Sequence, residues 1–424
     1  MKKIYGLDEI VKIVRKKSPF YRNLYKNLGE VPLISDLPIV DQSLFWIENN
    51  YKNNNVCTDK ICGGVIFRSG GTTGVPKFSW YNKIEWETFT TVFGEGISKL
   101  DLSPNDRVGN LFYAGEMYAS FLFINKSLEN SPINLLQFPL AGHISLDSAL
   151  NSINDYDINV LMGVPTTFVQ MAISLEKKLD PKLFLIAQKI EKIFYGGESL
   201  FLEQEELLKR VFKNLKTISS VGYASVDAGH LGYCSKDFEK GIHGVFSDSS
   251  IVEIVDQDSG EIIDRPDIVG KLIYTNLSRL GMPIIRYPTG DKGKWCLSGV
   301  GERFHLLGRS EEGARVGPVT VTREDILEAF KSSGLFHLID LFQLQIDRIH
   351  GFDQLTLMFS SRKILDLREI EILKEHFYLQ RKMFKDCVSQ GVLAPLQVIQ
   401  LGTDEFSRNP RTGKLIFIAD KRFN

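Results

Sequence analysis

Cysteine is scarce in this chain of 424 residues, and the five cysteines are mostly far apart. An odd number of cysteines at such spacing does not favour a set of structural disulfides. It indicates reduced thiols in a reducing compartment. No run approaches the roughly 18 apolar residues of a membrane span, and no apolar segment follows the first lysines as in a signal peptide. The sequence therefore predicts a soluble cytoplasmic protein that has no membrane partner.

An excess of either charge is also missing. Lys and Arg total 51 against 52 for Asp and Glu, so the formal net charge is −1 and the calculated pI is about 6.7. This balance argues against nucleic acid as a partner. With 43% hydrophobic and 24% charged residues, the composition is that of an ordinary folded globular protein, and neither an internal repeat nor a low-complexity segment is evident.

The length exceeds what one hydrophobic core usually organises, which predicts a large domain and a smaller one. Residues 1–50 have a helical pattern, whereas between residues 60 and 300 apolar runs of strand length alternate with amphipathic helices. We expect an α/β fold: a large N-terminal domain of β-sheets flanked by helices over residues 1–308, and a small C-terminal α+β lid domain over residues 309–424.

The C-terminal part has its own pattern of elements. The polar, glycine-bearing segment 308–320 is typical of an interdomain joint. After it the sequence predicts a helix, a pair of strands around residues 350–353, one long helix over residues 367–391 and a final strand.

The most informative segment is Arg68-Ser69-Gly70-Gly71-Thr72-Thr73-Gly74-Val75-Pro76-Lys77, directly after a strand-like run. Glycines let backbone N–H groups turn toward an anion, while hydroxyls and a lysine add donors and positive charge. These are the requirements of a polyphosphate cradle. The segment is neither a Walker loop nor the dinucleotide Gly-x-Gly-x-x-Gly pattern.

The order Ser-Gly-Gly-Thr-Thr-Gly-Val-Pro-Lys resembles the signature loop of the adenylate-forming superfamily, which includes acyl- and aryl-CoA synthetases. Further motifs of that family follow in the same order: Tyr195-Gly196-Gly197-Glu198, Gly222-Tyr223-Ala224-Ser225-Val226-Asp227, Arg286-Tyr287-Pro288-Thr289-Gly290-Asp291, Gly308-Arg309 and Asn409-Pro410-Arg411-Thr412-Gly413-Lys414. The segments SPFYRNLY and LPIVDQSLF, and Cys234 followed by Gly241-Ile242-His243, resemble the phenylacetate-CoA ligase branch. Val226 to Gly229 and Trp80-Tyr81 are similar to phenazine-carboxylate adenylating proteins.

The resemblance implies an enzyme that activates a carboxylic acid with ATP as an acyl-AMP. It implies ATP and Mg²⁺ as cofactors, Lys414, Lys77 and Asp227 as catalytic residues, and Asp227 as the metal ligand. The nucleotide-binding residues that it implies are Ser69, Gly70, Gly71, Thr72, Thr73, Gly74, Gly196, Gly197, Glu198, Gly222, Tyr223, Asp291 and Arg309. Residues 1–308 would then bind ATP and the acid, and residues 309–424 would form a mobile lid with Glu311 as its hinge.

The resemblance also places the acyl pocket at residues 112–118 and implies Tyr113, Gly115 and Ala224 as substrate-binding residues. Aromatic side chains there suit an aromatic acid. Coenzyme A is the leading acceptor, and the alternatives are a phosphopantetheinyl carrier protein or a reductase. A homodimer is common in this branch. A different class of function, a nucleotide-binding regulator without turnover, stays open.

Three histidines and one cysteine have more than one interpretation. His230, Cys234 and His243 are borderline or soft ligands at short spacing, which allows a structural metal site, a place beside the acyl pocket, or plain packing. His143 is expected to be satisfied by local hydrogen bonds, with carboxylate binding as the alternative.

Overall fold

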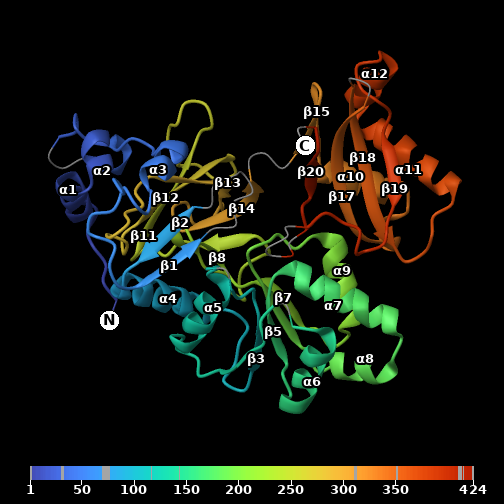
Figure 1. Cartoon of the computed structure of the whole chain (residues 1–424), viewed down its shortest axis with the longest axis horizontal. Coiled ribbons are helices and arrows are strands. Elements are labelled where there is room, and N and C mark those ends of the chain that lie inside the picture. The colour runs from blue at the N-terminus through green and yellow to red at the C-terminus, as the bar shows by residue number, and fades with distance from the viewer. Residues whose placement is uncertain are drawn as a thin grey trace. The chain divides into compact units, whose positions relative to one another are not determined.

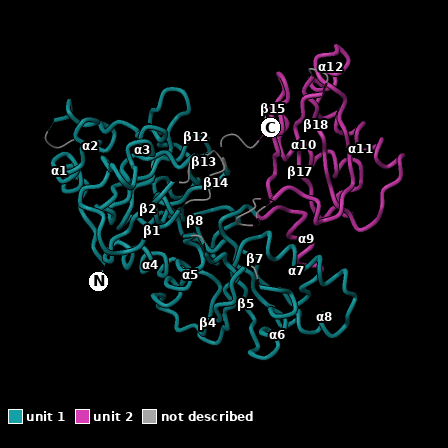
Figure 2. The backbone as a smooth tube through the Cα atoms, viewed as in Figure 1, with its two compact units in different colours: residues 1–199, 211–310 teal, residues 200–210, 311–424 magenta. Residues whose placement is uncertain are grey.

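The computed structural model describes residues 2–29, 33–68, 77–115, 117–142, 144–309, 313–349, 352–408, 413 and 415–422. The chain divides into two compact units, of which unit 1 comprises Met1–Ser199 and Val211–Ser310, and unit 2 comprises Leu200–Arg210 and Glu311–Asn424 (Figure 2). The predicted α/β class, with a large N-terminal part and a smaller α+β part, is confirmed. The lid motion and its boundary between residues 308 and 309 stay predictions.

A five-stranded parallel sheet forms one half of unit 1, in the strand order β4-β3-β5-β6-β7. Its strands are β3 (Arg107–Leu111), β4 (Leu136–Pro139), β5 (Val160–Gly163), β6 (Lys192–Tyr195) and β7 (Thr217–Ser220). Every residue of β5 and β6 is buried, as expected for central parallel strands that are covered on both faces. From β3 the chain first runs outward to β4 and then returns past β3 to β5, so the strand order reverses at this point.

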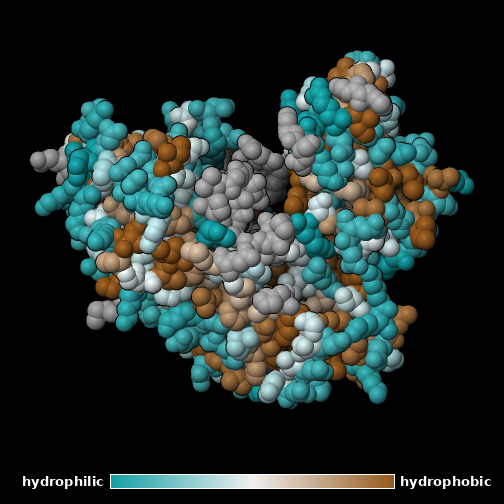
Figure 3. Space-filling model, in the orientation of Figure 1, coloured by the Kyte–Doolittle hydropathy of each residue, from teal (hydrophilic) through white to brown (hydrophobic). Residues whose placement is uncertain are grey.

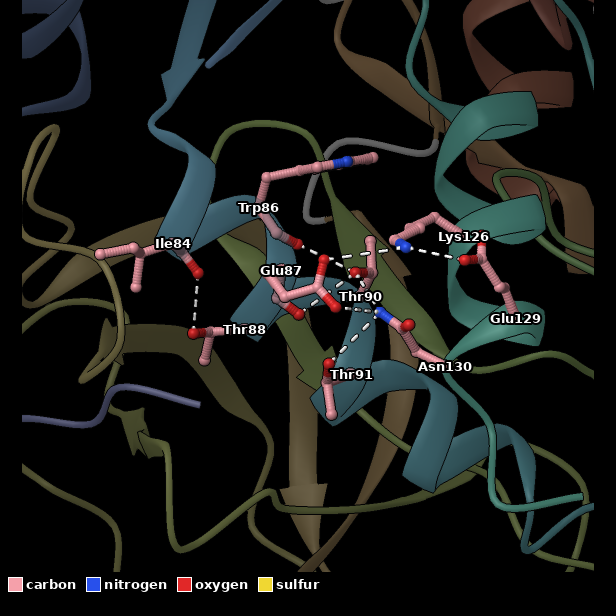
Figure 4. Close-up of polar contacts among 9 residues, drawn as sticks. All are labelled: Ile84, Trp86, Glu87, Thr88, Thr90, Thr91, Lys126, Glu129 and Asn130. Carbon is pink, nitrogen blue, oxygen red and sulfur yellow. Dashed lines mark hydrogen bonds and ion pairs between the residues drawn. The ribbon is translucent and has the colours of Figure 1, made fainter. Parts of the chain in front are cut away.

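Helices cover both faces of this sheet. In Figure 1, α4 (Lys83–Ile97) and α5 (Ser120–Glu129) lie on one side, and α6 (Leu146–Tyr156), α7 (Pro165–Lys178) and α8 (Pro181–Ala187) lie on the other. Polar side chains join α4 to the end of α5, because the Asn130 amide donates to Glu87 at 3.2 Å, Thr90 at 2.9 Å and Thr91 at 3.3 Å (Figure 4). A pair of helices fixed in this way is a firm support for the strands beneath it.

The other half of unit 1 is an antiparallel sheet in the order β10-β14-β13-β12-β11. Its strands are β10 (Ile242–Gly244), β11 (Ser250–Val255), β12 (Gly270–Asn276), β13 (Tyr287–Trp295) and β14 (Arg303–Arg309). Two hairpins accompany it: β1 (Val65–Arg68) with β2 (Phe78–Tyr81), and β8 (Tyr223–Ser225) with β9 (Gly229–Gly232). The phosphate-loop motif therefore connects the two strands of the first hairpin.

The N-terminal helices pack on this half of the unit. They are α1 (Leu7–Lys17), α2 (Pro19–Leu24) and α3 (Gln42–Glu48), with a 3₁₀ turn, η1 (Ile34–Asp36), before α3. Ser18 and Asp41 cap α2 and α3 through their side chains. One continuous core joins Ile10 and Phe45 of these helices to Tyr274 and Tyr287 of the antiparallel sheet. The N-terminal segment is thus an integral part of unit 1.

Unit 2 is built on a mixed sheet in the order β19-β18-β17-β20. Its elements are β15 (Gly313–Val316), β16 (Val319–Thr322), α10 (Arg323–Ser332), η2 (Phe336–Leu338), β17 (Ile339–Ile349), β18 (Phe352–Ser361), α11 (Leu367–Gln380), α12 (Lys382–Ser389), β19 (Gln397–Gln400) and β20 (Ile418–Asp420). A core that includes Phe330, Phe342, Phe359 and Phe377 lies between this sheet and the helices.

Three local features of the structure were not apparent from the sequence. Part of the predicted joint 308–320 forms the hairpin of β15 and β16 within unit 2. The predicted long helix breaks at Arg381, whose side chain donates to the Thr320 carbonyl and pairs with Asp325 at 3.5 Å. The helix α9 (Leu202–Val211), which connects β6 to β7 in the chain, lies almost entirely in unit 2. Local periodicity cannot reveal these three features, because tertiary contacts determine them.

Hydrophilic residues predominate on the face that Figure 3 presents, where the hydrophobic residues lie in separate groups. Within the described ranges, no helix combines the length and the apolar character that a membrane crossing requires.

Candidate active site

The carboxyl ends of three parallel strands carry several of the predicted site residues of unit 1. Tyr113 and Gly115 follow β3, the Gly196-Gly197-Glu198 turn follows β6, and Gly222-Tyr223 follows β7. Parallel strands present their carboxyl ends at one edge of the sheet, and ligands bind at that edge where the strand order reverses. The topology therefore brings motifs from separate parts of the sequence to one edge.

Glycine is required at two of these turns. Gly222 has a φ of 132°, which L side chains rarely adopt, and a Cβ there would lie 2.9 Å from the ring of Phe93. A Cβ at Gly196 would lie 2.9 Å from Val221, and Gly197 has a φ of 73°. The first turn, at Gly196, consequently packs closely on Val221, which follows β7, and the second, at Gly222, on Phe93 of α4.

Glu198 fixes the first turn to a helix. Its Oε2 accepts hydrogen bonds from the Thr166 backbone N–H at 3.1 Å and from the Thr166 hydroxyl at 2.7 Å, at the N-terminus of α7. A carboxylate is favourable there because the first N–H groups of a helix lack intrahelical partners. The other oxygen, Oε1, is buried and has no hydrogen-bond partner among the described residues. The structure thus gives Glu198 a supporting contact, and nucleotide binding by this residue stays a prediction.

Tyr223 and Asp291 come together from different sheets. The Tyr223 hydroxyl donates a hydrogen bond to the Asp291 carboxylate. The ring of Tyr223 lies edge-on to His243, with centroids 5.9 Å apart, and to Phe304 at 6.4 Å. Asp291 pairs in register with Arg309 on β14. Tyr223 and Asp291, two of the predicted nucleotide-binding residues, are therefore neighbours.

The arginine that opens the Arg286–Asp291 motif has a structural partner. Its guanidinium forms a buried bidentate pair with Glu253, with N···O distances of 3.0 and 2.9 Å. It also donates to the carbonyls of Ser35 and Leu37, which precede α3. Burial raises the pKa of Glu253, whereas Arg286 opposes this shift. Arg286 therefore ties the motif strand to the N-terminal segment.

Asp227 lies beside the strand that follows the glycine-rich segment. Its Oδ1 is 3.5 Å from the hydroxyl of Ser79 on β2, which donates to it. The Asp227 carbonyl accepts a hydrogen bond from Arg279, and Arg279 is 1% exposed. A carboxylate next to the end of the predicted phosphate loop is suitably placed for a role in nucleotide binding.

The sequence interpretation missed two residues of α3. Trp46 lies under the Lys77 ammonium, which is 5.2 Å from the ring centroid. The Trp46 ring N–H and the Gln42 amide both donate to the Tyr287 hydroxyl at 2.9 Å. Gln42 and Trp46 are four positions apart and share one helix face. The spacing of these two residues could have indicated a shared helix face. The N-terminal segment contains no recognised motif, however, so nothing in the sequence connected this face with the site.

The predicted acyl-pocket residues lie in two segments of unit 1. Tyr113 and Tyr118 are in edge-to-face contact, with ring centroids 5.7 Å apart, and Gly115 has a φ of 108°. Ala224 is half-buried and packs on the core cluster that includes Phe89, Phe93 and Phe123. Their binding of a substrate stays a prediction.

An open cavity of about 300 Å³ runs along the outer edge of β7. Its lining includes Tyr195 and Ser220, which end the strands before the two glycine turns, and the opposite wall comes from residues 234–242. The cavity thus reaches the same strand ends as the predicted nucleotide-binding turns.

His230, Cys234 and His243 have separate buried environments. The His230 ring bonds Ser249 at 2.8 Å, the His243 ring bonds the Gly241 carbonyl at 3.1 Å and stacks on Phe304, and Cys234 lies 3.9 Å from the Ile242 carbonyl. Burial lowers the pKa of His230 to about 3 and that of His243 to about 4. Within the part of the chain that the structure describes, no group of three or more His, Cys, Asp or Glu residues can hold a metal ion. The contacts favour packing over a metal site.

Several predicted residues lie outside the described ranges. They are Ser69, Gly70, Gly71, Thr72, Thr73 and Gly74 of the glycine-rich loop, His143, Glu311 and Lys414.

Comparison with known proteins finds relatives that are named as ligases or synthetases. The chain is 23% identical over 327 residues to a phenylacetate-coenzyme A ligase of Thermus thermophilus, matching 76% of the chain and 69% of the ligase. It is 26% identical over 280 residues to an indoleacetate–lysine synthetase of Pseudomonas savastanoi, matching 64% of the chain and 62% of that protein. No protein-family model matches the chain.

Solved structures share the fold. A 2-hydroxyisobutyryl-CoA ligase in the postadenylation state, in complex with 2-HIB-AMP, superimposes with a TM-score of 0.75 at 15% identity, covering 98% of this chain and 88% of that chain. An acyl acid amido synthetase in complex with 2,4-DB gives a TM-score of 0.69 at 13% identity, covering 94% and 86%. These similarities demonstrate a shared architecture.

Proposed function

We propose, from its confirmed likeness to adenylate-forming ligases and to their phenylacetate-CoA ligase branch, that this chain is an AMP-forming acid–thiol ligase. It activates a carboxylic acid with ATP as an acyl-AMP, releases pyrophosphate and transfers the acyl group to the thiol of coenzyme A. We also propose that, within this branch, the chain is related to phenazine-carboxylate adenylating proteins.

The observation that carries the proposal is the hydrogen bond between Tyr223 and Asp291. An aromatic ring that is hydrogen-bonded to a carboxylate can bind a nucleoside. The ring offers a face on which a base can stack, and the carboxylate can accept hydrogen bonds from ribose hydroxyls. The cavity along β7 reaches Tyr195 and Ser220, which end the strands before the two glycine turns. Gly196 and Gly222 let the two turns pack closely on Val221 and Phe93, which fixes the backbone of both turns.

In the first step, a carboxylate oxygen of the acid attacks the α-phosphorus of ATP. The bond from this phosphorus to the bridging oxygen of the β-phosphate breaks, and pyrophosphate leaves. Both reactants are anions, so the site must neutralise charge and hold the attack in line. Lys77 and the N–H groups and hydroxyls of residues 69–74 are proposed to hold the phosphates, and Lys414 to bring its ammonium to the reacting oxygens.

Mg²⁺ is proposed at Asp227. This cation prefers oxygen ligands and usually takes one or two carboxylates together with substrate phosphates and water. The Asp227 carboxylate and the Ser79 hydroxyl offer oxygen ligands 3.5 Å apart, and Ser79 lies on β2, the strand that follows the proposed phosphate-binding segment in the chain, so the two groups fit such a site. When bound, the ion would neutralise charge on the polyphosphate.

In the second step, the thiol sulfur attacks the acyl carbonyl, the bond to the AMP oxygen breaks, and the thiol loses its proton. Residues 309–424 are proposed to act as a lid that turns about Glu311 between the two steps, with Arg309 next to this hinge contributing to nucleotide binding. Such a motion would keep water away from the reactive mixed anhydride.

We propose an aromatic acid as the substrate. Tyr113 and Tyr118 form an aromatic pair directly after β3, and two of the relatives are named for phenylacetate and indoleacetate. Gly115 and Ala224 have small side chains that leave room for a ring. The enzyme is proposed to be cytoplasmic, and a homodimer is part of the same proposal.

A second candidate acceptor is an amine. One relative is named as an indoleacetate–lysine synthetase, and one structural neighbour as an acyl acid amido synthetase. In this reaction an amino group attacks the same acyl-AMP, and an amide replaces the thioester. Transfer to a phosphopantetheinyl carrier protein or to a reductase is a third route.

The test uses the purified full chain and a panel of aromatic and aliphatic acids. Acid-dependent exchange of labelled pyrophosphate into ATP is expected for aromatic acids. Coenzyme A, lysine and a carrier protein are then offered separately, and the product is identified by mass spectrometry. If the chain binds ATP but exchanges no pyrophosphate with any acid, it is a nucleotide-binding regulator and the proposed activity is wrong.

A further inference from the structure

Three successive backbone carbonyls around Asp227 are each held by a buried side chain from another part of unit 1. The carbonyl of Val226 accepts from the Tyr81 hydroxyl at 2.9 Å, that of Asp227 from Arg279, and that of Ala228 from the Asn276 amide at 2.8 Å. Tyr81 ends β2, Asn276 ends β12, and Arg279 lies just beyond β12. Carbonyls in a loop usually bond water or their own neighbours, so this arrangement defines the direction of the Asp227 segment closely.

Arg279 joins the Asp227 segment to β2, the strand that follows the glycine-rich loop in the sequence. Its second terminal nitrogen donates to the Trp80 carbonyl at 3.1 Å, and its guanidinium lies 4.0 Å from the ring centroid of Tyr81. The Tyr81 ring in turn stacks on Phe89 at 5.3 Å. One planar, rigid cation therefore sets the spacing between β2 and the backbone of Asp227.

The identity of this side chain is informative. Arg279 is 1% exposed, and burying a cation carries a desolvation penalty that a leucine or methionine of similar size would avoid. Within the described ranges it donates hydrogen bonds to the carbonyls of Asp227 and Trp80 and to the Met282 sulfur. A buried positive charge at this place favours negative charge nearby, on the Asp227 carboxylate and on a phosphate.

We propose that Arg279 is a positioning residue for Asp227. Together with Tyr81 and Asn276, it holds the backbone so that the Asp227 carboxylate faces the hydroxyl of Ser79 on β2. This inference rests on the proposed function, in which Asp227 serves the Mg²⁺–nucleotide complex. Arg279 acts through Asp227 and makes no contact with the substrate.

The first test is Mg²⁺-dependent binding of ATP, measured by calorimetry on the full chain without any acid. Supporting contacts to a metal ligand typically change metal affinity 10- to 100-fold. Arg279→Lys keeps the charge but loses the planar fork, so the half-saturating Mg²⁺ concentration is expected to rise by about tenfold. ATP binding without metal is expected to change less than about twofold, because no proposed phosphate contact is altered.

Tyr81→Phe provides a second variant if Arg279→Lys fails to fold. It removes one hydroxyl and leaves the ring stacked between Phe89 and Arg279. A shift in the same direction, of about two- to tenfold in half-saturating Mg²⁺, is expected from the loss of one hydrogen bond. Lys192→Met is the matched control, because it breaks the buried pair with Asp106 (3.0 Å) at the amino end of β6, away from the site. It is expected to lower the melting temperature without a shift in Mg²⁺ dependence.

A double-mutant cycle with Asp227→Asn separates positioning from general stability. If Arg279 acts through Asp227, Arg279→Lys adds nothing to the Mg²⁺ dependence of the Asp227→Asn chain. The proposal is wrong if Arg279→Lys and Asp227→Asn have additive effects on the half-saturating Mg²⁺ concentration. It is also wrong if Arg279→Lys lowers the melting temperature but leaves the Mg²⁺ dependence unchanged. The parent chain distinguishes the two levels of inference: if it binds no Mg²⁺–ATP, the proposed function itself fails, whatever the variants do.

Discussion

The phenol hydroxyl of Tyr223 donates a hydrogen bond to the Asp291 carboxylate, although the two residues are 68 positions apart in the chain. Tyr223 belongs to the hairpin of β8 and β9, and Asp291 to the antiparallel sheet. The bond orients the ring and the carboxylate relative to each other before any nucleotide binds. Pre-organisation of this kind lowers the entropy that binding must overcome.

The first prediction concerns this pair. Tyr223→Phe keeps the ring but loses the hydrogen bond, and the KM for ATP in pyrophosphate exchange is expected to rise about two- to fivefold. Tyr223→Ala also loses the stacking face, which is worth about 1–3 kcal/mol per base, so a rise of about 10- to 100-fold is expected. Equal KM values for the two variants would contradict base stacking on this ring.

The second prediction concerns Trp46, which lies under Lys77. Trp46→Ala removes a cation–π contact worth about 0.5–1 kcal/mol, so the KM for ATP is expected to rise about two- to fivefold. Ile47→Ala is the control, because this neighbouring side chain on α3 is 71% exposed. The KM of Ile47→Ala for ATP should equal that of the parent chain. An unchanged KM for Trp46→Ala would mean that α3 does not contribute to ATP binding.

The third prediction concerns a buried ion pair within unit 2. Arg323 donates to Glu203 of α9, and its guanidinium lies 3.2 Å from the ring centroid of Phe201 and 4.1 Å from that of Phe342. Both charged side chains are almost fully buried. Removing one partner leaves an uncompensated charge, so Glu203→Leu is expected to destabilise unit 2 by about 3–5 kcal/mol in urea unfolding.

The combined change Glu203→Leu with Arg323→Met provides the control for that loss. Both charges disappear, so most of the stability is expected to return. A double variant as unstable as Glu203→Leu alone would mean that packing of these side chains, and not their charge, holds α9 in unit 2.

The fourth prediction concerns pH. Burial lowers the pKa of His230 to about 3, against an ordinary value of 6.5. Between these two values the unfolded chain binds a proton that the folded chain does not, so the free energy of unfolding falls as the pH decreases through this window. From pH 7 to pH 5 the loss from this histidine is about 2 kcal/mol, since one pKa unit corresponds to about 1.4 kcal/mol.

His230→Gln isolates that contribution. Glutamine stays neutral and retains a hydrogen-bonding group toward Ser249, so urea midpoints of the variant should depend less on pH than those of the parent chain. His243, whose pKa burial lowers to about 4, adds a contribution of the same sign and remains in both chains. The same pH dependence in both chains would contradict a neutral, buried His230.

The sequence by itself determined the α/β class, the order of the motifs and their resemblance to adenylate-forming enzymes. These features depend on local signals: apolar periodicity gives the strands and helices, and glycines with hydroxyls and a lysine identify an anion-binding segment. Asp227, Tyr223 and Asp291 could be named from their motifs, because each motif is continuous in the chain.

Tertiary structure alone decided what those residues touch. The support of Asp227 by Arg279, the place of Trp46 under Lys77, the helix contact of Glu198 and the assignment of α9 to unit 2 all join segments far apart in the sequence. Local periodicity carries no information about such pairs, since a buried arginine or an N-terminal tryptophan finds its partner only when separate sheets and helices pack together. For the same reason, the ligand-like spacing of His230, Cys234 and His243 was ambiguous until their separate hydrogen bonds and ring contacts were visible.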